Sequence, residues 1–174
     1  MCLLSCRNGF YAFESALHVF PMTNEGGVIG ISDWNSHDLW RRYYEGLAEG
    51  YLFFAEDVFG YQFCAKEDAI FIFDPETGEA QPFSNTLEAW AEKVINDYKV
   101  VTGHPIAHEW QRQFGPLEPG CRLFPLKPFF AGGEFSVSNL KVVNSIEGMR
   151  ARGPIASQIR NLPDGSVIEI KVNG

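Results

Sequence analysis

The 174-residue sequence lacks both a hydrophobic run that could cross a membrane and the signatures of the common enzyme classes. No apolar stretch approaches the roughly 18–20 residues of a membrane span. The first residues have neither the basic start nor the long apolar segment of a secretory signal peptide. The G-x-S-x-G elbow, the P-loop and the dinucleotide motif G-x-G-x-x-G are all missing from the sequence. We therefore expect a cytoplasmic protein that holds no cofactor.

Cysteine is scarce, and its spacing matches no metal motif. The four cysteines are Cys2, Cys6, Cys64 and Cys121. None forms the paired C-x-x-C spacing of a zinc site, and a reducing compartment disfavours a structural disulfide. Cys2 and Cys6 could share a helix face, but two thiols with apolar neighbours are more often inert.

Basic residues are outnumbered, and the imbalance is concentrated in one segment. The chain holds 14 Lys and Arg against 22 Asp and Glu, a net charge of −8. Residues 45–97 carry 12 acidic and 2 basic side chains, so this segment alone contributes −10. Such a balance disfavours nucleic-acid binding. It has two interpretations: a basic protein partner docks on the segment, or acidic turns keep the protein soluble.

Hydrophobic periodicity predicts an α+β fold, with a central antiparallel β-sheet meander flanked by helices. The composition, 45% hydrophobic and 14% aromatic, is sufficient for a real core. Strands are expected at 51–55, 61–65, 69–73 and 80–83, an extended segment at 135–143, and a last strand at 167–172. Helices are expected at 33–49, 86–98, 105–114 and 145–162.

Two features of the C-terminal half qualify this prediction. Residues 115–128 hold four prolines and two glycines and are expected to form an ordered loop. Pro154 lies inside the helix expected at 145–162, where it should kink the helix or divide it in two. Arg150, Arg152 and Arg160 on the same helix are interpreted as a solvated basic face.

His104 and His108 are the one pair with metal-ligand spacing. Residues four apart on a helix can face a single ion. Pro105 occupies the place where a metallohydrolase of the H-E-x-x-H type has its general-base glutamate. Packing at the start of a helix is therefore the first interpretation, and a small metal-dependent hydrolase using His104 and His108 is the alternative.

One ordered set of motifs in the acidic segment resembles the SUKH superfamily, the Smi/Knr-like proteins. A strand ends in the acidic pair Glu56-Asp57, and an aromatic–glycine turn follows at Phe59-Gly60. A D-P-E-T-G turn spans residues 74–78, and Leu87, Glu88 and Trp90 open the next helix. The resemblance is strongest over residues 52–98. It implies a single SUKH-like domain over 1–174 with a C-terminal strand–helix–strand extension at 135–172.

The start of the chain departs from the pattern of this family. Only residues 1–6 precede the Asn8-Gly9 turn, where the family has a helix. A truncated or late-annotated start is one interpretation of this departure.

What the resemblance implies is a binding protein without catalysis. Bacterial members of this superfamily are mostly immunity proteins that bind and neutralise a cognate toxin, often a nuclease or deaminase. A basic toxin domain would suit the acidic segment. We therefore expect a protein partner, and neither nucleic acid nor membrane. The alternative within the same fold is a regulatory or scaffold protein that binds a cellular factor.

The predicted partner-binding residues are the acidic side chains of the turns and two aromatic anchors. Phe59 also has a structural interpretation, because the aromatic residue of such a turn often packs into the core. The set comprises Glu56, Asp57, Phe59, Tyr61, Glu67, Asp68, Asp74 and Glu76.

Overall fold

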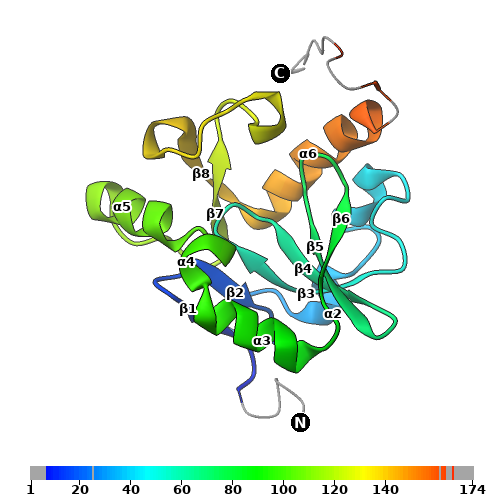
Figure 1. Ribbon diagram of the computed structural model, residues 1–174, viewed down its shortest axis with the longest axis horizontal. Coiled ribbons are helices and arrows are strands. Elements are labelled where there is room, and N and C mark those ends of the chain that lie inside the picture. Colours follow the sequence, from blue (N-terminus) through cyan, green and yellow to red (C-terminus); the bar gives the residue numbers. More distant parts are fainter. Residues whose placement is uncertain (1–6, 25, 161, 164–165, 167–174) are drawn as a thin grey trace.

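A six-stranded antiparallel sheet forms the centre of the molecule (Figure 1). The computed structural model describes residues 7–24, 26–160, 162–163 and 166. The strands follow the chain order: β1 (Phe10–Ala12), β2 (Leu17–Val19), β3 (Leu52–Asp57), β4 (Gln62–Lys66), β5 (Ala69–Phe73) and β6 (Ala80–Ser84). A separate two-stranded sheet pairs β7 (Cys121–Pro125) with β8 (Leu140–Asn144). The predicted α+β class is confirmed.

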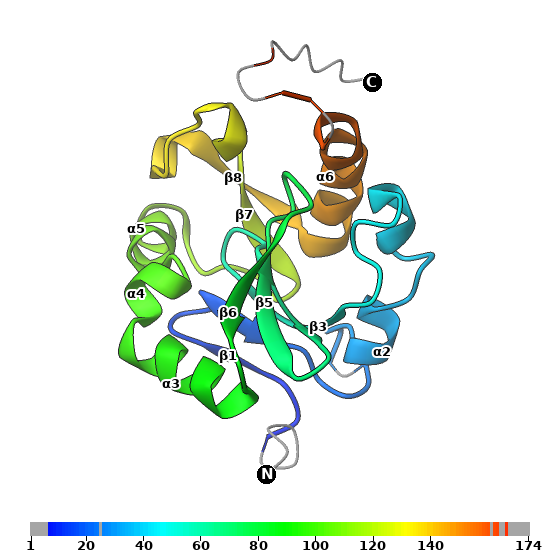
Figure 2. The same ribbon diagram turned by 45° about the vertical axis from the view of Figure 1, so that its right-hand side comes forward.

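Helices cover both faces of the central sheet. Both views place α3, α4 and α5 along one side, and α2 and α6 along the other (Figures 1 and 2). The longer helices are α3 (Leu87–Asn96), α5 (His104–Phe114) and α6 (Ser145–Ile159). The short ones are α2 (Ile31–Trp34), η1 (Arg41–Tyr44), α4 (Tyr98–Val101), η2 (Phe129–Ala131) and η3 (Val137–Asn139).

Alternating side chains of the strands supply two separate cores. Phe53 and Phe73 pack with Trp40 on the face covered by η1 and α6. Phe63 packs with Trp90 of α3 on the opposite face. The period-two pattern of the strands therefore holds a helical layer on each side of the sheet.

The meander and two helices lie close to the positions expected from the sequence. Strands β3 to β6 coincide with the four predicted strands to within two residues at each end. Thr86 caps α3 by accepting a hydrogen bond from the Ala89 amide, and Pro105 lies in the first turn of α5. Local turn and cap signals were sufficient here.

The single helix predicted at 33–49 is wrong. The segment forms the four-residue α2, turns and the 3₁₀ helix η1. Asn35 ends α2: its side chain donates to the Phe53 carbonyl and accepts from the Phe53 amide, which ties the chain to β3. Glu45 and Gly46 then adopt positive φ angles of 47° and 91°. Trp40 and Tyr44 of this segment are fully buried along this irregular path.

The loop predicted at 115–128 contains strand β7, which corrects that prediction. The Leu123 amide donates to the Val58 carbonyl at 2.8 Å, and both Arg122 and Leu123 are fully buried. Of the extended segment expected at 135–143, residues 137–139 form η3 and Leu140–Asn144 form β8. The pairing of β7 with β8, which are distant in the sequence, makes both segments strands. The prolines of residues 115–128 favoured a loop and gave no indication of this pairing.

Helix α6 is continuous through Pro154, so of the two expected effects, a kink or a division into two helices, the division is wrong. The predicted basic face is also wrong for Arg152, which is 6% exposed and points into the protein. The strand expected at 167–172, and Cys2 and Cys6, lie outside the described residues.

The edge strand β6 carries Pro82, opposite Phe71 of β5. Proline has no amide donor and is found at sheet edges for that reason.

Among the described residues, no helix combines the length and the apolar character needed to cross a membrane.

We predict that Gly153→Ala destabilises the protein, although alanine favours helices. A Cβ atom at Gly153 would lie 2.8 Å from the backbone of Tyr43, which cannot rotate away. The expected loss in the free energy of unfolding is about 1–3 kcal/mol, measured by urea denaturation. Gln158→Ala, at an exposed position of the same helix, is the control and should change stability by less than about 0.5 kcal/mol. An equally mild Gly153→Ala would contradict the close approach of α6 to η1.

Candidate functional site

The eight predicted partner-binding residues do not form one acidic surface. Glu56, Asp57 and Glu76 are 1%, 5% and 3% exposed, so these three acids cannot contact a partner as predicted. Asp74 is half-buried, and Glu67 and Asp68 are exposed at the β4–β5 turn. The structure therefore leaves Glu67 and Asp68 as the exposed acids of the predicted set.

Glu56 is the centre of a buried polar cluster. Its Oε1 lies 3.0 Å from Nε of Arg122 and 3.2 Å from Nδ1 of His18, and it accepts a 3.1 Å hydrogen bond from the Ser145 hydroxyl. Its Oε2 accepts from the side-chain amide of Gln62 at 3.2 Å. The contact with Arg122 is an ion pair without the alignment of a hydrogen bond.

The charge of Glu56 is used inside the molecule. Burial raises the pKa of this carboxyl, but Arg122 and the hydrogen bond from His18 outweigh burial and hold the pKa below its usual range. Burial also lowers the pKa of His18, despite the neighbouring carboxylate. Glu56 is thus an ionised counter-ion for the buried Arg122.

Glu76 makes a second internal ion pair. Its Oε1 lies 3.5 Å from Nη2 of Arg152, and its Oε2 accepts a 3.1 Å hydrogen bond from the Phe130 amide. Arg152 also donates to the Phe59 carbonyl and stacks over the ring of Phe124. The predicted D-P-E-T-G turn is present, but its glutamate joins α6 to the sheet rather than facing solvent.

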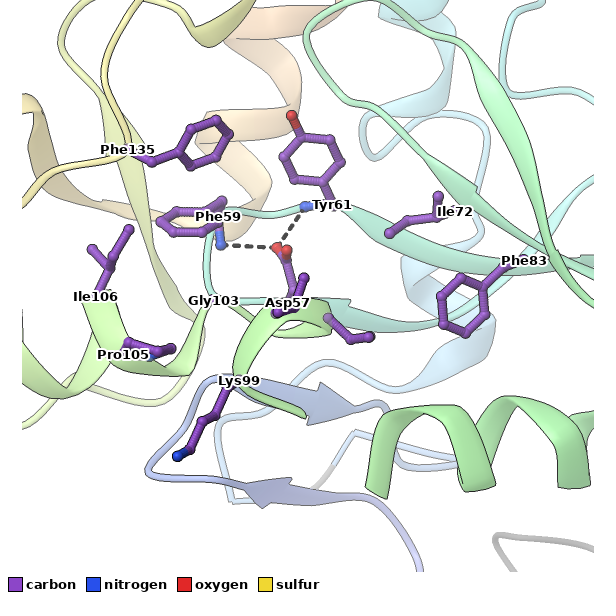
Figure 3. Close-up of a pocket in the computed structure, with 12 residues that line it drawn as sticks. Asp57, Phe59, Tyr61, Ile72, Phe83, Lys99, Gly103, Pro105, Ile106 and Phe135 are labelled. Atoms are coloured by element: carbon purple, nitrogen blue, oxygen red, sulfur yellow. Dashed lines mark hydrogen bonds between the residues drawn. The ribbon is translucent and has the colours of Figure 1, made fainter. Parts of the chain in front are cut away.

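Asp57 closes the turn between β3 and β4. Its Oδ1 accepts hydrogen bonds from the amides of Phe59 (2.8 Å) and Tyr61 (2.9 Å), as Figure 3 shows. Gly60 takes a φ of +86° at this turn. Burial raises the pKa of Asp57 to about 8, although both amide hydrogen bonds act in the opposite direction. At neutral pH the carboxyl is therefore mostly protonated.

A largely apolar pocket of about 550 Å³ opens beside this turn. Its walls come from the β3–β4 turn, from strands β5 and β6, from the α4–α5 junction, and from the segment between η2 and η3 (Figure 3). The lining residues are Asp57, Phe59, Tyr61, Ile72, Phe83, Lys99, Val100, Val101, Gly103, Pro105, Ile106 and Phe135. Pockets of this size, with few polar groups, are typical ligand or anchor sites.

Phe59 packs as the structural interpretation expected. It is 4% exposed, so its predicted role as a protruding anchor is wrong. Its ring meets those of Phe129 and Phe135 edge-on, each at 5.5 Å between centroids. At Gly103 (φ +69°) an added Cβ would lie 2.3 Å from the Phe59 ring, so this position requires glycine. Tyr61 and Phe83 are half-buried and Phe135 is 54% exposed, so these are the aromatic groups of the pocket that solvent reaches.

Three predicted residues, Asp57, Phe59 and Tyr61, therefore line one pocket, although as wall and floor rather than as a charged surface. The opposite wall escaped prediction. Val100 and Ile106 lie some 40 residues further along the chain, and Phe135 further still. Nothing in their local sequence distinguishes them from ordinary apolar positions.

A second cluster joins Glu14 to the two histidines with metal-ligand spacing. Glu14 Oε2 lies 3.2 Å from Nε2 of His104 and 2.7 Å from Nδ1 of His108. The hydrogen bond from His108, opposed by slight desolvation, lowers the pKa of Glu14. Glu14 could not be predicted, because a glutamate 90 residues away from a histidine pair gives no local signal.

We predict that Glu56→Ala costs about 3–5 kcal/mol of unfolding free energy, because it leaves Arg122 buried without its counter-ion. Glu67→Ala, an exposed acid of the same predicted set, should change stability by less than about 0.5 kcal/mol. Urea unfolding followed by tryptophan fluorescence measures both. A loss at Glu56 no larger than at Glu67 would contradict the structural role assigned to Glu56.

We also predict that Asp57→Asn flattens the dependence of stability on pH. The folded protein retains a proton that the unfolded chain, with the ordinary Asp pKa of 3.8, releases earlier. The contribution of Asp57 is therefore fully present below pH 3.8 and is lost as pH rises towards about 8. The slope attributable to this group is at most about 1.4 kcal/mol per pH unit.

Asparagine keeps the acceptor oxygen of Asp57 but does not titrate, so the variant should lose less stability than the wild type between pH 5 and 8. Unfolding free energies at several pH values test this, with Asp68→Asn as the exposed control. Parallel pH profiles for wild type and Asp57→Asn would refute the assignment.

Comparison with known proteins does not assign the chain to a family. No protein-family model and no curated protein matches the chain. Solved structures do match it, among them the crystal structure of Atu4351 from Agrobacterium tumefaciens. That chain is 12% identical, with 81% of this chain and 67% of that one aligned at a TM-score of 0.48. A match at this level carries no argument about function, which has to come from the residues above.

Proposed function

We propose that this protein is a non-catalytic, immunity-type binding protein that neutralises a cognate bacterial toxin by binding it. The observation that carries the proposal is the open pocket beside the β3–β4 turn, which offers a place for an apolar anchor of the partner. The expectation that the partner is a toxin rests on the resemblance of residues 52–98 to the SUKH superfamily.

The rim of the pocket supports a protein partner. Val100 is 77% exposed and Phe135 is 54% exposed, while Phe59, Val101 and Ile106 form the apolar wall behind them. Binding energy at interfaces concentrates where an apolar side chain enters such a pocket and excludes water. An exposed apolar rim around a concave site suits this kind of contact.

The charge of the surface supports a basic partner even without the buried acids. Of the 12 acidic residues in 45–97, Glu56, Asp57 and Glu76 are buried and Asp74 is half-buried, which leaves eight exposed acids against two exposed lysines. The exposed charge of this segment is therefore about −6 instead of −10. Such a surface accelerates association with a basic domain at low ionic strength.

The proposal differs from the sequence-based hypothesis in the surface that it assigns. The anchor site is the pocket with Tyr61, Val100 and Phe135, and the acids that steer the partner are exposed ones such as Glu67 and Asp68. Glu56, Asp57 and Glu76 stabilise the scaffold. A scaffold protein that binds a cellular factor is the alternative that the experiment must separate.

We predict that Val100→Asp weakens partner binding by about tenfold or more, because it places a charge on the apolar rim of the pocket. Ile95→Asp is the matched control: it is 67% exposed on α3, equally β-branched, and does not line the pocket. Wild type and both variants serve as bait for proteins from the source organism, at low and high salt. Captured proteins are identified by mass spectrometry.

The expected partner is retained by wild type and Ile95→Asp, is lost from Val100→Asp, and is a basic domain that kills a bacterial host unless this protein is co-expressed. Equal retention by both variants would remove the pocket from the interface. A captured partner that is harmless when expressed would replace the toxin proposal with the scaffold alternative.

A further inference from the structure

We propose that Glu14, His104 and His108 form a binding site for a divalent transition-metal ion such as Zn²⁺. This inference goes beyond the proposed function and does not depend on it. The three side chains offer two imidazole nitrogens and one carboxylate oxygen, and these donor atoms all lie within 4.8 Å of one another. Two histidines and one carboxylate are a donor set that zinc and related ions prefer.

Both histidine nitrogens face the same carboxylate oxygen. A single oxygen, Oε2 of Glu14, contacts both Nε2 of His104 (3.2 Å) and Nδ1 of His108 (2.7 Å). Donors bound to one ion at about 2.1 Å are about 3.4 Å apart in a tetrahedral site and about 3.0 Å in an octahedral one. An ion would require the 2.7 Å contact to open by about 0.3–0.7 Å, and the two histidine nitrogens, which lie within 4.8 Å of each other, to reach a similar spacing.

Helix α5 fixes the two histidines. His104 and His108 are one turn apart, and their rings stack with centroids 5.9 Å apart. The ring of Tyr98 meets that of His104 edge-on at 5.1 Å between centroids, and Phe13 stacks against Tyr98 at 4.5 Å. The imidazole of His104 is thus held by packing, as a metal ligand needs to be.

The β1–β2 turn holds Glu14 against these histidines in a costly conformation. Phe13, Glu14 and Ser15 have φ angles of 51°, 52° and 64°, which lie in the left-handed region that is unfavourable for residues other than glycine. Gln111 of α5 compensates in part by donating a 2.7 Å hydrogen bond to the Glu14 carbonyl. The backbone is therefore tied to the same helix that carries the histidines.

The site is open to solvent on one side. Glu14 and His108 are about half exposed, at 54% and 48%, while His104 is 19% exposed. A hollow of about 270 Å³ adjoins it, lined by Glu14, His108, Gln111, Arg112 and Pro116. Three protein donors leave at least one coordination position, which water can occupy from this side.

Zinc titration by isothermal calorimetry tests the proposal. The protein is purified without a polyhistidine tag and stripped with a chelator, and the metal added is ZnCl₂ alone. The expected result is one zinc ion per chain, with affinity that falls as pH is lowered because the ligands must be deprotonated. His108→Ala and Glu14→Gln should each weaken binding by about tenfold or more.

His37→Ala is the matched control, since His37 is exposed and outside the cluster. It should bind zinc like the wild type, and circular dichroism should show that all three variants are folded. Absence of binding to the wild type, or equal affinity in wild type and His108→Ala, would overturn the proposal. Titration with CoCl₂ is a second readout: a thiolate charge-transfer band would assign the metal to cysteines and also overturn it.

Discussion

The buried carboxylate of Glu56 is the contact on which the arrangement of the elements depends. It lies on β3 and meets one polar group from each of four other elements: His18 of β2, Gln62 of β4, Arg122 of β7 and Ser145 of α6. A buried ion pair is of little net benefit by itself, but removal of one partner leaves the other unpaired at high cost. The second sheet and the last helix are thereby fixed to the central sheet in one orientation.

Much of the central sheet could be predicted from the sequence, because its signals are local. The turns at 57–60 and 74–78 separate neighbouring strands, and Thr86 and Pro105 lie at the starts of helices. Each of these signals lies within a few residues of the element boundary that it determines. Strand β7 could not be predicted in this way, since its partner β8 lies 15 or more residues away and prolines surround it. The helix predicted after Asn35 was also wrong because of a contact between residues distant in the sequence. The side chain of Asn35 binds the backbone of Phe53, and this contact overrides the helical pattern.

The candidate site, like the fold, could be predicted only in its local features. Asp57, Phe59 and Tyr61 were predicted as parts of an exposed partner-binding surface, whereas the structure places them in the lining of a pocket. Charge in a sequence does not state whether a carboxylate faces water or a buried arginine. The pocket and the Glu14 cluster are both completed by residues that lie 40 to 90 positions away in the sequence and are brought together by the fold. No local sequence pattern predicts such contacts.

The two edge strands of the central sheet, β1 and β6, constrain how the molecule can associate with a partner. Recognition by strand addition needs a free row of amides and carbonyls at a sheet edge. On one side the edge strand β6 carries Pro82, which interrupts the donor row, and on the other β1 is three residues long. Both features are devices that discourage edge-to-edge pairing. A partner that docks on the central sheet is therefore expected to contact side chains rather than backbone, so its specificity can change by substitution without disturbing this sheet.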